Sequence, residues 1–136
     1  MDTFQVRILA ADDSFFEGNC QFMVIPASDG ALGILAHHSN MIAAVVPGAL
    51  RFQPDDGALR TASVSAGLVK VENNEVLVLV DAAERPEDID VNRAKRAADE
   101  AREALLQQKS RQEYKRAQAN LARAISRLRV RERWQN

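Results

Sequence analysis

Apolar and polar residues alternate along much of the first eighty positions of the chain, which is the period of half-buried β-strands. Two segments show the pattern clearly. Their alternate apolar residues are Phe4, Val6 and Ile8 in the first segment, and Cys20, Phe22 and Val24 in the second, which Pro26 ends. Because successive strand residues point to opposite faces, we expect each set to lie on one buried face.

Turn-forming residues separate these short apolar segments. The run 41–46 is closed by Pro47-Gly48, and Pro54-Asp55-Asp56-Gly57 is strong turn chemistry between two further strands. The segment VENNEVLVLV predicts a hairpin, because Asn73 and Asn74 both tolerate the positive φ angles of a tight turn. Many short strands at close spacing predict a small β-sandwich or β-barrel.

The period changes to steps of three and four residues from Ile89 onward, which predicts helices. Pro86 precedes the first helix, and Asp88 or Asp90 can cap its amide groups. The polar segment 107–112 (QQKSRQ) interrupts the apolar stripe, so we expect two helices in an antiparallel hairpin. The stripe consists of Ala94, Ala97, Ala98, Ala101, Ala104 and Leu105, and then of Ala117, Leu121, Ala124, Ile125 and Leu128.

Alanine dominates this stripe, and alanine favours helix but buries little apolar surface. We therefore expect the hairpin to hold together, and to hold to the β-domain, only weakly. One interpretation is a solvated, charged hairpin that adds little to function. The other is a movable element whose two arrangements differ by a few kcal/mol.

Charge divides the chain in the same place as the hydrophobic pattern. The 136 residues carry a net charge of -1, but residues 1–83 hold four basic and ten acidic side chains, while residues 84–136 hold fourteen basic and nine acidic ones. This asymmetry predicts two domains, 1–84 and 85–136, with different partners. The single cysteine, Cys20, excludes an internal disulfide framework, and the first residues lack the features of a signal peptide, so we expect a soluble protein in a reducing compartment.

Candidate chemistry is sparse. Gly30 and Gly33 do not form a phosphate loop, because the lysine and the Ser or Thr of that motif are missing. His37 and His38 are adjacent and make a poor chelating pair, so we expect no metal site and a packed or hydrogen-bonded His38. Ser39 lacks a carboxylate partner that the sequence can show, so we expect no catalytic residues and no enzyme activity.

A basic cluster from Lys109 onward contains nine Lys and Arg residues against two acidic ones, which leaves a nucleic-acid-binding module as the alternative function. Few aromatic residues accompany the cluster and the first half is acidic, so we expect no nucleic acid partner. A salt-titrated gel shift with random DNA or RNA separates the two functions.

Several motifs together resemble the epsilon subunits of bacterial F-type ATP synthases, their chloroplast counterparts and the mitochondrial delta subunits, over essentially the whole chain. They are DGALGILAHHSN, similar to a Gly-x-x-Gly-Ile-x-x-x-His loop, VVPGAL, VSAGLVKVENNEVLVLVDAAER and IDVNRA. The resemblance implies an α+β fold, an N-terminal small β-sandwich followed by a C-terminal antiparallel α-helical hairpin. The chain departs from the family pattern at 36–40, where Pro-Gly-His-Ala-Pro is usual, and at Ala31 and Lys70, where glutamate is usual.

The resemblance implies a non-catalytic central-stalk (rotor) subunit of a proton-translocating enzyme, peripheral to the membrane on the cytoplasmic face of a bacterial plasma membrane or the stromal side of a thylakoid. The sandwich would contact the gamma subunit and the c-ring through Asp29, Gly30, Ala31, Leu32, Gly33 and His38. The hairpin would extend along gamma toward the catalytic beta and the alpha subunits and inhibit ATP hydrolysis. Basic residues that fit the contact with beta are Arg116, Arg123, Arg127 and Arg129, followed by Arg131 and Arg133.

The segment IDVNRA is similar to an ATP-binding signature, Ile/Leu-Asp-x-x-Arg-Ala, of some family members. No cofactor is obligatory, but the resemblance implies that ATP binds and holds the hairpin folded. Arginines four residues apart on one helix face can fork onto phosphates, although Glu100 stands where some binders have arginine. The alternative is that Asp90 is only a helix cap and Arg93 an exposed residue. The implied site is Glu84, Ile89, Asp90, Arg93, Ala94, Arg123 and Arg127.

Overall fold

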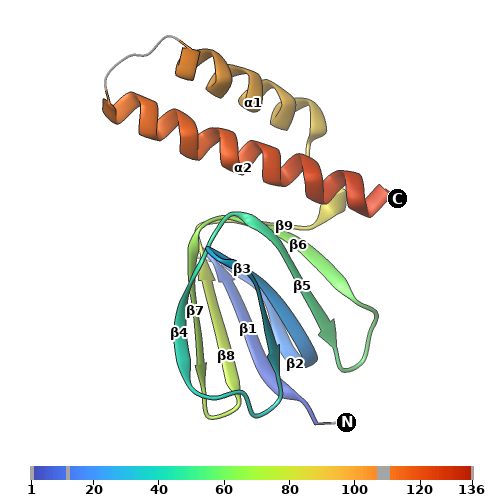
Figure 1. Ribbon diagram of the computed structural model, residues 1–136. Helices are drawn as coiled ribbons and strands as arrows, with labels where there is room; N and C mark the ends of the chain where they lie inside the picture. The colour runs from blue at the N-terminus through green and yellow to red at the C-terminus, as the bar shows by residue number, and fades with distance from the viewer. Residues whose placement is uncertain (1, 12, 107–110, 136) are drawn as a thin grey trace. The chain divides into compact units, whose positions relative to one another are not determined.

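The computed structural model describes residues 2–11, 13–106 and 111–135, with the side chains of the last helix described from 115 to 132. The chain divides into two compact units, Met1–Glu84 and Arg85–Asn136 (Figure 1). The first unit is all β and the second is helical. The expected α+β class, a β-sandwich followed by a helical hairpin, is confirmed.

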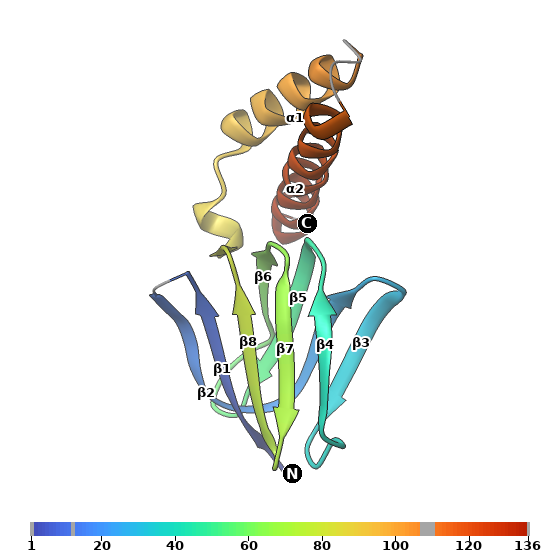
Figure 2. The same cartoon turned by 90° about the vertical axis from the view of Figure 1, so that its left-hand side faces the viewer.

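The described part of the first unit contains nine strands. They are β1 (Phe4–Ala10), β2 (Asp13–Ala27), β3 (Gly30–Leu35), β4 (Met41–Val45), β5 (Gly48–Pro54), β6 (Arg60–Val64), β7 (Gly67–Glu72), β8 (Glu75–Val80) and β9 (Ala83–Glu84). Their order is β4-β7-β8-β1-β2-β5-β6-β9, and β3 pairs with β2. The long β2 pairs with β1, β3 and β5, so it links the two layers. Figure 2 shows β4, β7, β8 and β1 side by side in one layer.

The core lies between the two layers and is mainly aliphatic, as the alternation in β1 predicts. Phe4, Val6 and Ile8 are all buried, and they meet Phe52 and other residues from the neighbouring strands in one cluster. Each large apolar side chain buried in this way contributes about 1.5–3 kcal/mol relative to exposure. This cluster lies wholly within the sandwich unit, so the sandwich has a core of its own.

The predicted burial pattern of β2 is wrong beyond Cys20. Cys20 is buried as expected, but the next buried residues are Met23 and Ile25, while Phe22 and Val24 are only partly buried. The cause is a register shift between Cys20 and Phe22 in the pairing with β5, where an extra residue reverses the alternation of faces. The strand also continues through Pro26 to Ala27.

Both expected hairpins after β4 are confirmed. The β5 and β6 strands pair on either side of the Pro54–Gly57 turn. Asn73 and Asn74 have φ angles of 52° and 63°, so both occupy the left-handed region that a two-residue hairpin turn requires. This asparagine turn, Asn73–Asn74, joins β7 to β8.

The second unit begins with a short 3₁₀ turn, η1 (Pro86–Asp88), followed by α1 (Val91–Leu106) and α2 (Arg111–Gln135). Asp90 caps α1, because its Oδ1 accepts a hydrogen bond from the Arg93 amide at 3.0 Å. Such a cap contributes about 1 kcal/mol. Residues 107–110 of the predicted polar link 107–112 lie outside the described residues. The last two residues of the link, 111 and 112, belong to α2.

Alanines form most of the buried face of the hairpin. Ala94, Ala98 and Ala101 are buried on α1, and Ala117 and Ala124 are buried on α2. The expectation that Ala104 shares this face is wrong, because Ala104 is exposed. At 100° per residue it lies about 80° around the helix from Ala94. Neither described helix has the length and apolar composition needed to cross a membrane.

Burial makes the Cys20 thiol unreactive, and this leads to a pH prediction. Desolvation raises its pKa from 9.0 to about 11, with Arg60 opposing the shift. Above pH 9 the unfolded chain loses this proton while the folded chain keeps it, so we expect the free energy of unfolding to fall between pH 9 and about 11. Urea titrations of the parent chain and Cys20→Ala across this range measure the effect, and an equal slope in both proteins contradicts it.

Candidate functional site

The residues expected to contact gamma and the c-ring lie along strand β3 and beyond both of its ends. Asp29, Gly30 and Ala31 form the exposed tip of the β2–β3 hairpin, and Gly30 has a φ of 124°, which favours glycine. Gly33 is also exposed on β3 and Leu32 is half-buried. His38 follows the opposite end of β3, roughly 20 Å away along six residues of strand. The β2–β3 hairpin tip and the loop that follows β3 therefore lie at opposite ends of this strand (Figure 2).

His38 belongs to a loop that we call the histidine loop, residues 36–40, between β3 and β4. Its Nδ1 lies 2.8 Å from the Ser39 carbonyl oxygen, so the ring is hydrogen-bonded as expected. Its own amide donates to the Leu35 carbonyl at 3.2 Å. His37 has a φ of 66°, a left-handed conformation that is uncommon for a residue with a Cβ.

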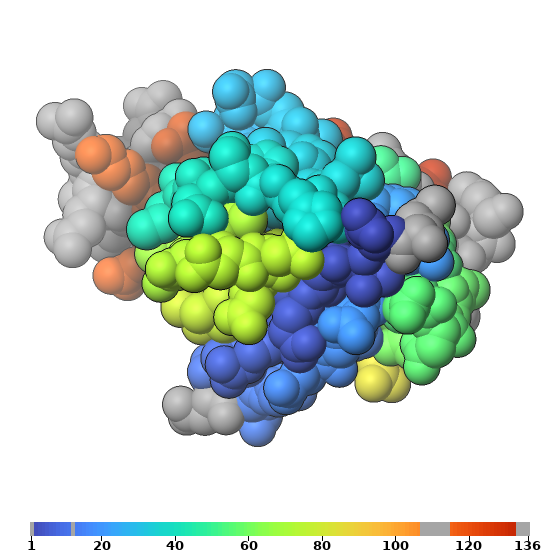
Figure 3. Space-filling model, turned by 90° about the horizontal axis from the view of Figure 1, so that it is seen from below, coloured from blue at the N-terminus to red at the C-terminus, as the bar shows by residue number. Residues whose placement is uncertain are grey.

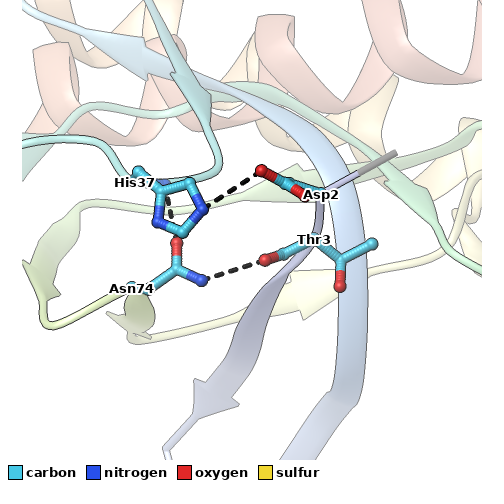
Figure 4. Close-up of polar contacts among 4 residues, drawn as sticks. All are labelled: Asp2, Thr3, His37 and Asn74. Atoms are coloured by element: carbon cyan, nitrogen blue, oxygen red, sulfur yellow. Dashed lines mark hydrogen bonds and ion pairs between the residues drawn. The ribbon is translucent and has the colours of Figure 1, made fainter.

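Side chains from other segments hold the histidine loop (Figure 4). The Asn74 Oδ1 accepts a hydrogen bond from the His37 amide at 2.6 Å, and the Asn74 Nδ2 donates to the Thr3 carbonyl at 2.9 Å. The His37 Nε2 lies 3.3 Å from an Asp2 carboxylate oxygen, with both side chains mostly exposed. The asparagine turn, the entry to β1 and the histidine loop thus form one polar cluster.

An apolar surface on the sandwich was not identified from the sequence. We call it the outer face: the outward side of the layer β4-β7-β8-β1. The Cα register places Ala44, Leu68, Leu79 and Leu9 in one row across the four strands. The next row holds Ile42, Lys70, Leu77 and Arg7.

Three of these apolar side chains are well exposed: Ile42 at 69%, Leu68 at 51% and Leu79 at 43%. The signal in the sequence is VLVLV, where both the inward and the outward positions are apolar. A strand with one face in water normally has polar residues at the outward positions. Contiguous exposed apolar residues of this kind mark interaction surfaces.

Lys70, which stands where the family usually has glutamate, lies on this outer face beside Glu72. Their side chains form an ion pair of 2.8 Å. The hydrogen bond and charge of each partner raise the pKa of Lys70 and lower the pKa of Glu72. Both side chains are exposed, so the ion pair contributes little to the stability of the fold. It places two charged groups on the outer face.

Most of the expected ATP-binding residues lie in the helical unit, in varied environments. Ile89 and Ala94 are buried and serve packing, whereas Arg93 is exposed on the first turn of α1. Arg123 is exposed and bonded to Asn120, and Arg127 is partly buried. Glu84 ends β9 and pairs with Ser63 of β6, so it belongs to the sandwich unit, within the expected first domain 1–84.

One hydrogen bond fixes the register of the two helices at the base of the hairpin. The Arg131 Nη1 donates to the Pro86 carbonyl oxygen at 2.9 Å. The bond joins the C-terminal part of α2 to η1, which precedes α1.

The basic residues of α2 differ in their availability. Arg116, Arg123 and Arg129 are exposed, while Arg127 is partly buried. The side chain of Arg133 lies outside the described residues. Among the described residues, no group of three His, Cys, Asp or Glu side chains is placed to hold a metal ion.

Two family models cover nearly the whole chain. The model for the beta-sandwich domain of the ATP synthase delta/epsilon chain matches residues 3–86. The model for the long alpha-helix domain of the same chain matches residues 87–132. Two ATP synthase epsilon chains are similar to this protein over most of their length. That of Ruminiclostridium cellulolyticum is 41% identical, covering 94% of this chain and 95% of the relative, and that of Thioalkalivibrio sulfidiphilus is 41% identical, covering 94% and 92%.

Solved structures show the same fold at low sequence identity. A chain of the OSCP/F1/c-ring structure of the Euglena gracilis mitochondrial ATP synthase superposes with a TM-score of 0.81 at 20% identity, covering 91% of this chain and 78% of that one. A chain of the central stalk/c-ring structure of the Tetrahymena thermophila enzyme gives 0.65 at 10% identity, with 93% and 95% covered. From the family models and the relatives together, the chain belongs to the ATP synthase delta/epsilon chain family.

Proposed function

We propose that this protein is a non-catalytic rotor subunit in the central stalk of a proton-translocating F-type ATP synthase. The observation that carries the proposal is the apolar outer face, which needs a protein partner in a family whose members are chains of a larger complex. The two structural neighbours belong to an F1/c-ring and a central stalk/c-ring assembly, which supports the same placement.

The partners follow from this placement. The outer face packs on the gamma subunit, and the exposed tip of the β2–β3 hairpin, Asp29 to Gly33, meets the polar loops of the c-ring. The protein is then peripheral to the membrane, on the cytoplasmic face of a bacterial plasma membrane or the equivalent stromal side of a thylakoid.

Association with the stalk is expected to depend on the outer face. Leu79→Glu places a charge in the centre of its apolar row, and we expect at least about a tenfold loss of affinity, because burying an unpaired charge costs several kcal/mol. The matched control is Leu59→Glu, since Leu59 is similarly exposed at 48% but lies outside these four strands. Co-purification with gamma and an alpha–beta hexamer, followed by a binding titration, measures the effect.

Failure of the parent chain to co-purify with these subunits contradicts the proposed function. Equal losses in Leu79→Glu and Leu59→Glu contradict the role of the outer face while leaving the function standing.

The helical unit regulates ATP hydrolysis in this proposal. Released from its folded state, α2 extends along gamma and brings Arg116, Arg123, Arg127 and Arg129 toward an acidic part of the catalytic beta subunit. Release of α2 from η1 breaks the bond between Arg131 and Pro86, and separation of the helices exposes a small seam made mostly of alanine, with Val130 as a larger buried residue. Because alanine buries little area, the folded and extended states differ by only a few kcal/mol.

ATP biases this equilibrium toward the folded hairpin. Asp90, Arg93, Arg123 and Arg127 form its binding site, near Ile89 and Ala94 in the same helical unit. ATP at roughly ten times its Kd contributes about 1.4 kcal/mol. A full reversal from 1:99 to 99:1 takes about 5.5 kcal/mol, so ATP acts on an element that is already near balance.

Calorimetric titration of the isolated subunit with ATP tests the nucleotide site. We expect measurable binding, and about a tenfold weaker Kd in Arg127→Ala, because a charged contact to phosphate is worth roughly 1.5–3 kcal/mol. Arg93→Ala is expected to act in the same direction. Arg129→Ala removes an exposed arginine from the same helix and serves as the control.

A Kd for ATP above roughly 10 mM in the parent chain contradicts ATP regulation. Such a Kd corresponds to a binding free energy of less than about 3 kcal/mol. Binding that survives Arg93→Ala and Arg127→Ala unchanged contradicts this site alone.

A further inference from the structure

A groove lies on the sandwich where the first half of β2 faces the turn between β5 and β6. Its volume is about 550 Å³, and we call it the β2 groove. Figure 3 shows blue residues of β2 next to the green β5–β6 turn at this end of the sandwich. One wall consists of residues 14–19 of β2, and the other consists of Asp55, Asp56 and Arg60.

The β2 wall of the groove has an open strand edge. The segment 13–19 of β2 pairs with β1 on one side, while β5 begins to pair with β2 only at Cys20. Among the described residues, the backbone hydrogen bond across the open side of this segment runs from the Asp55 amide to the Asn19 carbonyl, at 2.9 Å. Backbone groups of a strand point alternately to its two sides, so those of Glu17 lie on the same open side as those of Asn19. Such an edge can accept one more strand.

Two phenylalanines form the apolar part of the groove. The pairing of β1 with β2 shifts register between Ile8 and Leu9, which leaves Phe15 as an extra residue in β2. This bulge interrupts the alternation of faces. Phe15 and Phe16 therefore both pack partly against the core and both line the groove.

The Phe16 ring is held in place by its neighbours. Its centroid lies 4.7 Å from that of Phe52, and the Arg60 Cζ lies 5.6 Å from the Phe16 centroid in a cation–π contact. Gly18 leaves room for the ring, because a Cβ at this position would lie 3.1 Å from the Phe16 Cζ. The apolar wall is thus formed before a ligand binds, which lowers the entropic cost of association.

The charged residues of the groove are mostly acidic. Glu17, Asp55 and Asp56 are exposed, and Arg60 is the one basic residue among the described residues of the lining. None of the three carboxylates has an ion-pair partner within the described parts of the chain. A ligand with lysine or arginine side chains supplies the complementary charge. The same carboxylates repel the equivalent edge of a second copy, which disfavours self-pairing.

We propose that the β2 groove binds an extended segment of another protein, which carries lysine or arginine residues and adds to β2 as a strand. The backbone groups of Glu17 pair with the main chain of the segment. Its apolar side chains pack on Phe15 and Phe16, and its basic side chains meet the carboxylates. No residue of the four outer-face strands lines the groove, so the two surfaces are separate.

Titration of the full chain with synthetic peptides, followed by nuclear magnetic resonance, tests this proposal. The basic probe is acetyl-Lys-Val-Lys-Val-Lys-Val-amide, and the acidic control has Glu in place of each Lys. We expect the basic probe to shift the amide resonances of residues 14–19 and 55–60, and to bind at least about tenfold more tightly than the acidic control. Methylation of every backbone nitrogen of the basic probe keeps its charge but removes its hydrogen-bond donors, and we expect these shifts to be lost.

Asp56→Asn and Asp29→Asn are matched variants for the charge contribution. Each aspartate is followed by Gly-Ala-Leu at a hairpin turn, but only Asp56 lines the groove. We expect Asp56→Asn to weaken binding of the basic probe about threefold, and the combined Asp55→Asn and Asp56→Asn variant to weaken it about tenfold. Asp29→Asn should match the parent chain.

Four outcomes contradict the proposal. Absence of shifts in residues 14–19 at millimolar concentrations of the basic probe, or equal binding of the acidic control, overturns it. Equal binding of the methylated probe overturns the addition of a strand to β2. Equal affinity of the Asp29→Asn and Asp56→Asn variants overturns the role of the carboxylates. Shifts of the same resonances with protein concentration alone indicate that a second copy of this chain fills the groove, and overturn its assignment to another protein.

Discussion

Replacing Gly67 with alanine is expected to lower the free energy of unfolding of the sandwich unit by more than about 3 kcal/mol. A Cβ at this position would lie 1.9 Å from the Leu79 carbonyl oxygen and 2.8 Å from the Val80 Cα. These are backbone atoms, so no side chain can rotate away. This overlap can be relieved only if β7 and β8 move apart where Gly67 pairs with Val80.

Urea denaturation of the full chain, followed by the circular dichroism of the β-structure, measures this change. Gly33→Ala is the matched control, because a Cβ there has no heavy atom within 4 Å and lies on an exposed strand. We expect its effect to stay within about 0.5 kcal/mol, as for ordinary surface substitutions. Similar stability of Gly67→Ala and Gly33→Ala contradicts the close approach of β7 and β8.

Features of the fold that depend on neighbouring residues could be predicted from the sequence. The alternation in β1, the turn at Asn73–Asn74 and the Asp90 cap each follow from local chemistry, and the structure has all three. The faces of β2 beyond Cys20 could not be predicted, because the register shift there depends on pairing with β5, some thirty residues later. The alternation of apolar and polar residues along one strand does not reveal where an extra residue shifts its pairing with another strand.

The candidate site was harder to predict because proximity in the sequence does not give proximity in the structure. Asp29 and His38 are close in the sequence, yet the extended strand β3 carries them apart. The pairing of Glu84 with Ser63 could not be predicted, because a two-residue strand such as β9 leaves no periodic pattern. The Asn74 side chain accepts a hydrogen bond from a backbone amide that is distant in the sequence, and such a contact has no local sequence signature.

The outer face was missed for a different reason. Strict alternation gives one apolar and one polar face, but β8 is apolar on both, with Val76, Val78 and Val80 inward and Leu77 and Leu79 outward. A strand that is apolar on both faces indicates that something covers its outer side. This pattern was present in the sequence, and it indicates a protein partner for the outer face.

Ending the chain after Glu84 is expected to leave a folded, assembling subunit and to raise the ATP hydrolysis of the complex about fivefold, equivalent to about 1 kcal/mol of barrier. The truncated chain keeps β9, whose residues pair with Ser63 and Val64 of β6, and keeps the whole buried cluster of the sandwich. A cooperative thermal transition of the fragment and its co-purification with gamma establish the first part. Hydrolysis measured over a range of ATP concentrations establishes the second.

The gain in hydrolysis is expected because truncation removes the positive charge that, in the proposed function, the extended hairpin brings to the catalytic beta subunit. A variant with Arg116, Arg123 and Arg129 changed to Gln keeps the hairpin but loses exposed charge, and we expect an intermediate rate. The alanine seam remains in that variant, so a rate equal to that of the truncated enzyme assigns inhibition to charge alone. Hydrolysis that is the same with the full and truncated chains at every ATP concentration contradicts an inhibitory hairpin, while leaving the contacts of the sandwich with the rotor intact.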